Sequence, residues 1–219
     1  MKRSLAFILV AAATFFTVAC KKSSGPSAGY GASSLFPLTN GDTWYYIDSS
    51  FSDTGGAPEA YLDTMVATKA TYTDASGTIY LGMNNPNGWF GGSYIAVDPN
   101  NSAVYEVDSP SFHPYIMFAM VNSDGPIARP SYDNSNPACP ITYNQIGYAS
   151  PVQIKGFNCY ENAETITDCN NTVLEQTNYF VSPGVGVVRI EDYYTDTTGG
   201  AKKFYEDFSQ TLTDTAFVR

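Results

Sequence analysis

The sequence predicts an all-β fold, a single antiparallel meander of about ten strands curved into a half-barrel or sandwich. From Leu35 onward, apolar and polar residues alternate with a period of two, which is the side-chain period of a strand. Short segments rich in Gly, Asn, Asp and Pro separate these runs, as turns do. Aromatic residues make up 15% of the chain, with 17 Tyr and 13 Phe, which suits a packed core and excludes a disordered chain.

The first half of the domain contains five expected strands. The run 65–73 (MVATKATYT) is the clearest, because β-branched and aromatic residues dominate it. In the first strand, Trp44 and Tyr46 should share one face and Tyr45 the other. The five expected strands are residues 43–47, 65–73, 78–83, 94–97 and 104–107, with turn formers at 53–56, 74–77 and 98–101.

The second half continues the pattern after one long interruption. Residues 122–140 carry Pro126, Pro130 and Pro137 and show little periodicity, which predicts a long surface loop. A twisted sheet of this length must close or curl to hide one face from water. The remaining expected strands are residues 115–121, 141–146, 152–157, 172–181, 185–194 and 203–212.

The N-terminus is typical of a secretory signal. Lys2 and Arg3 precede the apolar run 5–13 (LAFILVAAA), which is too short to span a bilayer. Residues 17–20 (TVAC) then resemble the lipobox of bacterial lipoproteins, in which the cysteine is diacylated and the signal is cut before it. The resemblance implies a signal peptide at 1–19, acylation of Cys20 and membrane anchoring through lipid. The alternative is a soluble secreted protein with a cysteine near the cleavage site.

Residues 21–34 (KKSSGPSAGYGASS) predict a flexible Gly/Ser tether, so the expected organisation is signal 1–19, lipidated tether 20–34 and one β domain 35–219. Residues 35–46 (LFPLTNGDTWYY) are similar to the FPLxxGxxWxY opening of uncharacterised Bacteroidota-type envelope lipoproteins. Residues 182–188 (SPGVGVV) resemble a PGVGLV-like segment near the end of the same proteins. The resemblance implies a β-rich envelope lipoprotein and brings no established activity with it.

The same two segments have a physical interpretation. Gly41 permits the turn that directs Trp44 inward. Gly184 and Gly186 permit a turn with positive φ and would let the backbone approach another strand closely. In such bacteria an acidic cluster after the lipidated cysteine resembles a surface-export signal. Lys21 and Lys22 stand there instead, which favours an outer-membrane position facing the periplasm.

Cys139, Cys159 and Cys169 remain for an oxidising compartment, where a disulfide is the default. If strand 160–167 is extended, Cys159 and Cys169 lie about 30 Å apart, far beyond the about 4.4–6.8 Å that a disulfide allows between Cα atoms. In a meander, 141–146 runs up and 152–157 returns, so Cys159 comes back to the level of Cys139. The prediction is a Cys139–Cys159 bridge with Cys169 unpaired.

Composition limits the chemistry. The chain has 21 acidic and 11 basic residues, a formal net charge of −10 and no basic stripe, which argues against a nucleic-acid partner. One histidine, His113, and scattered cysteines predict no metal site, no cofactor and no catalytic residues. The acidic pairs 191–192 and 206–207 are adjacent in strands, so the members of each pair should point to opposite faces.

Binding is the expected activity, and two versions stay open. In the first, a concave apolar face holds a hydrophobic envelope ligand such as a lipid, because aromatics exceed what a compact core needs. In the alternative, the domain is a glycan- or protein-binding accessory module that uses loop aromatics. The binding candidates are Trp89, Phe90 and Tyr94 in the segment 88–94 (GWFGGSY), unless this loop merely plugs one end of the sheet. A third hypothesis, from a different class of function, is a carbohydrate-active enzyme.

Overall fold

The computed structural model describes residues 35–52, 56–85, 93–98, 103–107, 115–127, 139–196 and 203–217. Regular structure within these ranges is entirely β, and none of it is a helix that is long and apolar enough to cross a membrane. The strands are β1 (Thr43–Ser50), β2 (Glu59–Thr73), β3 (Ile79–Asn84), β4 (Tyr94–Asp98), β5 (Ala103–Val107), β6 (Tyr115–Ala119), β7 (Gly125–Pro126), β8 (Thr142–Gly147), β9 (Val152–Ile154), β10 (Phe157–Thr167), β11 (Val173–Ser182), β12 (Gly186–Asp196) and β13 (Lys203–Ala216).

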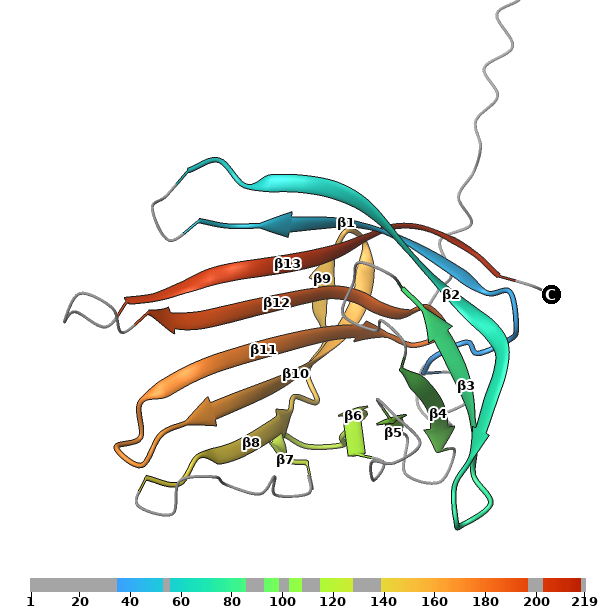
Figure 1. Ribbon diagram of the computed structural model, residues 1–219, viewed down its shortest axis with the longest axis horizontal. Coiled ribbons are helices and arrows are strands. Elements are labelled where there is room, and N and C mark those ends of the chain that lie inside the picture. Colours follow the sequence, from blue (N-terminus) through green and yellow to red (C-terminus); the bar gives the residue numbers. More distant parts are fainter. Residues whose placement is uncertain are drawn as a thin grey trace, which may run out of the picture.

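The strands form one antiparallel sheet in the order β6-β5-β4-β3-β2-β1-β13-β12-β11-β10-β8-β7, with β9 paired to β10 alone (Figure 1). The all-β, antiparallel prediction is confirmed. The meander, however, consists of two runs, because the first and last strands of the domain pair in the middle of the sheet through Thr43 to Ser50 and Phe208 to Ala216. The two edges of the sheet, β6 and β7, are therefore consecutive in the chain.

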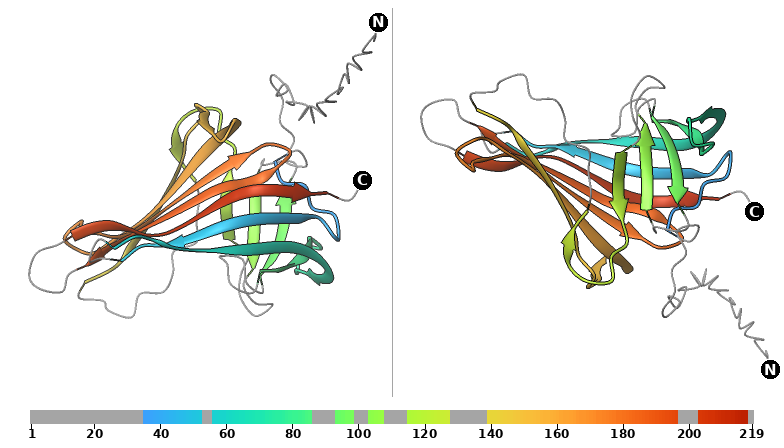
Figure 2. Two further views of the ribbon diagram at one scale, coloured as in Figure 1. Left: turned by 90° about the horizontal axis from the view of Figure 1, so that it is seen from above. Right: turned by 90° about the horizontal axis from the view of Figure 1, so that it is seen from below.

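The sheet is strongly curled but is not a closed barrel. Strands β3–β6 cross the long strands at a steep angle and cover only one end of them (Figure 2). The curl brings edge strand β6 to β8 and β10, where side chains replace a backbone ladder. Asn162 Oδ1 accepts from Ala119 N at 2.9 Å, and Gln145 Nε2 donates to Met117 O at 2.5 Å. These amides satisfy backbone groups that an edge strand would otherwise leave open.

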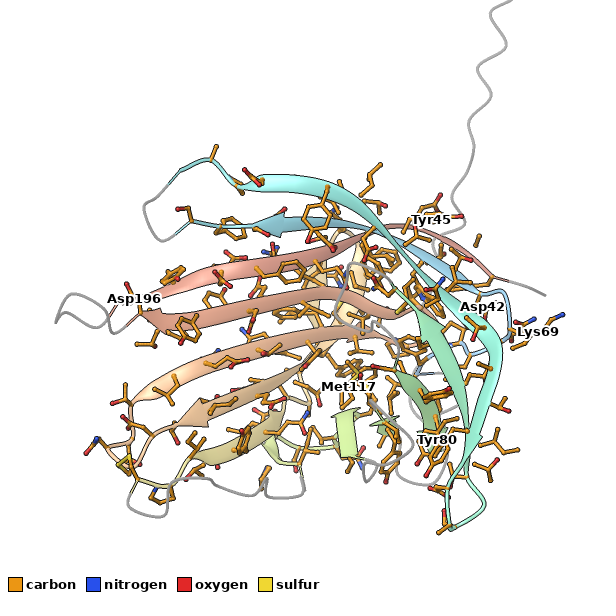
Figure 3. All side chains as sticks on the ribbon, viewed as in Figure 1. Asp42, Tyr45, Lys69, Tyr80, Met117 and Asp196 are labelled. Carbon is orange, nitrogen blue, oxygen red and sulfur yellow. A yellow bond between two sulfur atoms is a disulfide. The ribbon has the colours of Figure 1, made fainter. Side chains whose placement is uncertain are left out.

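The core lies where the two parts of the sheet face each other. Trp44 and Tyr46 are fully buried and Tyr45 is 40% exposed, which confirms the predicted alternation in β1. The Phe36 ring lies 5.0 Å from Trp44 and 6.1 Å from Phe118, measured between ring centroids. Met117 on β6 points into this cluster (Figure 3). Part of the aromatic surplus noted in the sequence thus fills the core, whereas Tyr45, Tyr61, Tyr194 and Phe204 stay exposed.

The structure differs from three predicted elements, which are the strands 65–73 and 152–157 and the loop 122–140. The run 152–157 is two strands, because Lys155 (φ 48°) and Gly156 (φ 87°) form a tight turn inside it. Strand β10 continues to Thr167, and β2 begins at Glu59, six residues before the predicted start. The predicted loop 122–140 contains the short strand β7. In both extensions, buried positions are occupied by polar residues, Asp63 in β2 and Asn162 and Glu164 in β10, so apolar periodicity gave no signal for them.

The predicted disulfide is wrong: Cys139 is bonded to Cys169, with Cα atoms 4.9 Å apart, and Cys159 is a buried free thiol. The reason is the pairing partner of β8, which is β10 rather than residues 152–157. Their register places Thr142 opposite Thr167. Cys139, just before β8, therefore meets Cys169, just after β10. Burial raises the pKa of Cys159 to about 12.

Candidate functional site

The two motifs near the ends of the domain contact each other. Trp44 Nε1 donates to Val185 O at 2.7 Å, and Tyr46 OH donates to Val187 O at 3.0 Å. Between these carbonyls lies Gly186, where a Cβ would stand 2.7 Å from the Phe36 ring. The predicted positive φ angles are confirmed at Gly184 (74°) and Gly186 (94°), and Gly41 also has a positive φ (95°). The close neighbour of Gly186 is the Phe36 ring rather than the backbone of another strand. The two motifs thus form one packing unit in the core.

The ligand-binding candidates are only partly placed. Trp89 and Phe90, like His113 and Cys20, lie outside the described residues. Tyr94 lies on β4, and its ring centroid is 6.1 Å from that of Tyr72. Tyr94 packs against the small core cluster of Tyr80, Ala96 and Val107 together with Tyr72 and Tyr105. A packing role accounts for Tyr94.

Two buried carboxyl groups lie beside the core on the inner face of the sheet. Gln210 Nε2 donates to Asp48 Oδ1 at 2.9 Å and to Asp63 Oδ2 at 3.4 Å. Asp48 Oδ2 and Gln210 Oε1 are buried and have no hydrogen-bond partner within the described part of the chain. Burial, and to a smaller extent Asp63, raise the pKa of Asp48 to about 6, against the lowering effect of Gln210.

We expect Asp48 to make the protein less stable as the pH rises toward neutrality. Its folded-state pKa of about 6 exceeds the ordinary 3.8, so its contribution is complete below pH 3.8 and is lost as the pH rises through 6. Asp48→Asn should raise the free energy of unfolding by about 2 kcal/mol at pH 7.5 and change it little at pH 4. Urea unfolding at both pH values measures this difference.

The pH dependence should be reduced in Asp48→Asn but not abolished, because burial also raises the pKa of Asp192 to about 6. The matched control is Asp214→Asn, which removes an exposed carboxylate on β13. An unchanged pH dependence in Asp48→Asn, or the same reduction in Asp214→Asn, would contradict the assignment.

The best candidate for ligand binding is on the opposite face, at the end of the long strands that β3–β6 leave uncovered (Figures 1 and 2). Ile190 is buried in the core, so its neighbours on β12, Arg189 and Glu191, point outward. On this outer face Phe204 stacks on Tyr193, with ring centroids 5.4 Å apart and planes 15° apart. Phe204 remains 46% exposed.

An open groove runs beside this aromatic pair. It has a volume of about 330 Å³ and is lined by Thr172, Val173, Gln176, Thr195 and Phe204. The register of the strands brings these side chains together, because Gln176 is opposite Tyr193 and Thr195 is opposite Phe204. We call Gln176, Arg189, Glu191, Tyr193, Thr195, Phe204 and Glu206 the outer-face site.

A charged cluster continues the site along the strands. Arg189 Nε lies 2.8 Å from Glu191 Oε1, and Arg189 Nη2 lies 3.8 Å from Glu206 Oε1. Tyr193 OH donates to Glu191 Oε2 at 3.0 Å. Burial and the neighbouring Glu191 raise the pKa of Tyr193 to about 12, so its hydroxyl stays a donor at neutral pH. The cluster fixes the ring on which Phe204 stacks.

Sequence reasoning missed this site for an identifiable reason. The acidic pair 191–192 does split between the faces, since Glu191 points outward and the inward Asp192 accepts from Thr177 Oγ1 at 3.0 Å. Glu191 and Glu206, one from each acidic pair, nevertheless lie on the same outer face. They do so because β12 and β13 are neighbours and Glu206 is opposite Tyr193. The available signal was that the expected strands 185–194 and 203–212 are consecutive in a meander and so should be neighbours in the sheet.

The outer-face site is equipped for binding. An exposed aromatic ring, an amide and threonine hydroxyls line one groove, and the charged cluster lies on the same face, a combination that suits a polar ligand with apolar ring faces. Within the described ranges, no group of three or more His, Cys, Asp or Glu side chains could hold a metal ion. A second cavity of about 350 Å³ lies at the β7–β8 edge, and among the described residues that line it only Tyr143 is ionisable.

The fold defines the class only as an all-β protein built on one curled antiparallel sheet. No protein-family model matches the chain, and no curated protein matches it. Two solved structures are similar. A "putative exported protein with YmcC-like fold" from Bacteroides fragilis is 10% identical, with a TM-score of 0.41 over 84% of this chain and 99% of that one. A "putative lipoprotein" from Parabacteroides distasonis is 13% identical, with a TM-score of 0.33 over 83% of this chain and 98% of that one.

Proposed function

We propose that this chain is an envelope lipoprotein, anchored through Cys20, whose β domain binds a carbohydrate at the outer-face site. The observation that carries the binding proposal is the exposed Phe204, stacked on Tyr193 beside a groove lined by Gln176 and Thr195. Sugars present apolar C–H faces and a rim of hydroxyls. An aromatic face with amide and hydroxyl groups beside it complements both features.

A carbohydrate fits the structure better than the lipid cargo suggested by the aromatic surplus. The rings that would line an apolar cavity pack on one another instead, as Phe118 does on Phe36 and Tyr179. The aromatics left at the surface of the outer-face site stand among polar and charged groups. The glycan-binding alternative is therefore retained, with aromatics of the sheet face in place of the loop residues Trp89 and Phe90.

The anchor proposal rests on the sequence. The charged start, the short apolar run and the segment 17–20 (TVAC) predict cleavage before Cys20 and its acylation. The 14 residues of the tether, 21–34, would give an end-to-end distance of about 20 Å. We place the domain on the periplasmic side of the outer membrane, because Lys21 and Lys22 occupy the positions of an acidic export cluster.

Phe204→Ala should weaken carbohydrate binding at least tenfold. The substitution removes the exposed stacking face, and anchor residues of this kind contribute more than about 1 kcal/mol. The full chain, extracted in mild detergent, is first applied to an array of defined oligosaccharides. The strongest binder is then titrated by calorimetry with both proteins.

The control for Phe204→Ala is Leu62→Ala, which removes an apolar side chain that is 78% exposed on β2, away from the site. It should leave the affinity unchanged. If no oligosaccharide binds, or if both variants bind as the natural chain does, the carbohydrate proposal is wrong.

Cys20→Ser should move the protein from the membrane to the soluble envelope fraction, because it removes the acceptor of the acyl chains. Metabolic labelling with a radioactive fatty acid should mark the natural chain and not the variant. Cys159→Ser, which replaces the buried free cysteine, is the control and should stay labelled and membrane-bound. Labelling of Cys20→Ser would refute the anchor.

A further inference from the structure

The groove of the outer-face site is lined by uncharged side chains. Its described lining consists of Val173, Phe204, Gln176 and two threonines. The guanidinium of Arg189 lies on the same face but outside this lining, and its Nε contacts Glu191 Oε1 at 2.8 Å. A charged group that leaves water needs a charged or hydrogen-bonding partner to replace it. The lining therefore favours an uncharged group of the ligand.

The two threonines of the lining can accept hydrogen bonds from a ligand but have no donor to offer. Thr195 Oγ1 donates to Val173 O at 2.6 Å. Hydrogen bonds from the backbone and the side chain of Thr172 lower the pKa of Asp168, and the Thr172 backbone N lies 2.8 Å from Asp168 Oδ1. A hydroxyl group has one hydrogen, so both hydroxyls are committed within the protein. The ligand should therefore bring a donor of its own.

An apolar side chain and an amide stand together on the β11 side of the groove. The β10–β11 register shifts between Ile166 and Thr167, so Val173 and Gln176, which are three residues apart, line the same groove. Gln176 Nε2 donates to Asn178 Oδ1 at 3.0 Å, which holds the amide in place. The carbonyl oxygen of this amide is then available to accept from a ligand, next to the methyl groups of Val173.

The groove extends across three strands. Phe204 is on β13, Thr195 is opposite it on β12, and Val173 and Gln176 are on β11. Neighbouring strands are about 4.8 Å apart, so β11 lies about 10 Å from β13. A sugar ring lying on Phe204 therefore reaches Val173 and Gln176 only through a substituent. That substituent meets an apolar side chain and an amide carbonyl side by side.

We infer that the ligand of the outer-face site is an N-acetylated amino sugar, with its ring on Phe204 and its acetamido group lying across β12 toward Val173 and Gln176. The inference rests on the proposed carbohydrate function and names the class of sugar. The acetamido methyl packs on Val173, and the acetamido N–H donates to Gln176 Oε1. A hydroxyl in its place lacks the methyl group. A free ammonium would lose hydration beside Val173 without a carboxylate among the described lining residues.

The test uses the full chain in mild detergent and calorimetry at a pH where free amines are protonated. Oligosaccharides of N-acetylglucosamine and of N-acetylgalactosamine are compared with the matching glucose and galactose oligomers and with a glucosamine hexamer. At least one acetylated probe should bind about tenfold more tightly than its unacetylated counterpart, which is the low end of the effect of one methyl group in an apolar pocket. The glucosamine hexamer should bind more weakly than the N-acetylglucosamine oligomer.

Two variants examine the two contacts of the acetamido group. Val173→Thr exchanges a methyl group for a hydroxyl and should weaken binding of the acetylated probe about fourfold, while leaving its unacetylated counterpart unaffected. Gln176→Met removes the acceptor and should weaken binding of the acetylated probe about fivefold. It also serves if Val173→Thr does not fold. The matched control is Val152→Thr on β9, away from the site, where the side chain is 38% exposed.

The possible failures are distinguishable. Equal affinity for acetylated and unacetylated probes, with all binding lost in Phe204→Ala, would overturn the inference and leave the carbohydrate proposal standing. Equal weakening by Val173→Thr and Val152→Thr would also overturn it, because the effect would not depend on the groove. If no sugar binds at all, the carbohydrate proposal fails together with the inference.

Discussion

Gly186→Ala is expected to lower the free energy of unfolding by about 2–4 kcal/mol. The backbone at Gly186 has φ 94°, a conformation that costs an alanine about 1 kcal/mol. The new Cβ would also stand 2.7 Å from the Phe36 ring, which is buried against Trp44 and Phe118. Overpacking of this kind costs about 1–3 kcal/mol. Urea unfolding followed by circular dichroism measures the sum.

Gly156→Ala separates the two causes. Gly156 has a similar φ of 87°, but a Cβ there would meet no atom within 4 Å. It should therefore show only the backbone cost. A second check is the double variant Gly186→Ala with Phe36→Leu, whose cost should be less than additive because the two sites are in contact. Equal destabilisation by Gly186→Ala and Gly156→Ala would show that the ring is not the obstacle.

Trp44→Ala should destabilise the protein by about 3–5 kcal/mol, the range for emptying a buried aromatic site. Trp44 is fully buried, and its ring lies 5.0 Å from Phe36 and 5.5 Å from Phe217. The substitution also removes the donor to Val185 O, and leaving a buried carbonyl unpaired costs about 1–3 kcal/mol more where water cannot reach it. The change in urea midpoint measures the total.

The control for Trp44→Ala is the next residue along the same strand. Tyr45 points to the other face and is 40% exposed, so Tyr45→Ala should cost much less. Trp44→Phe should lie between the two, because it keeps most of the ring volume and loses the hydrogen bond to Val185. Comparable effects of Trp44→Ala and Tyr45→Ala would contradict the orientation of β1.

Together these variants examine the contact between the two segments that resemble envelope lipoproteins. Trp44 and Phe36 belong to the first segment, and Val185 and Gly186 to the second. In the sequence they are 141 residues apart. Their meeting requires β13 to lie between β1 and β12, which is the pairing that joins the two halves of the sheet.

Local properties were readable from the sequence. Period two gave the strands, and it placed Trp44 and Tyr46 on the buried face because alternation depends only on neighbouring residues. The positive φ at Gly184 and Gly186 followed from the absence of a side chain. Strand ends were less accurate where buried positions hold polar residues, as Asp63 does in β2 and Asn162 and Glu164 do in β10.

The candidate site was readable only in part. Alternation correctly separated Glu191 from Asp192, but it could not show that Glu191 and Glu206 would share Arg189. That meeting depends on the register between β12 and β13, including an irregularity at Asp192/Tyr193. A shift of one residue would have turned Glu206 to the other face.

The sequence by itself determined an all-β chain, its turns and the inward residues of its strands, because these depend on residues close together in the chain. Only the tertiary structure decided that β1 pairs with β13, that Cys139 bonds to Cys169, and that the outer-face site exists. Backbone hydrogen bonds are the same for every pair of strands, so the pattern along one strand does not name its partner. Partner and register are set by how all the strands bury their apolar faces together.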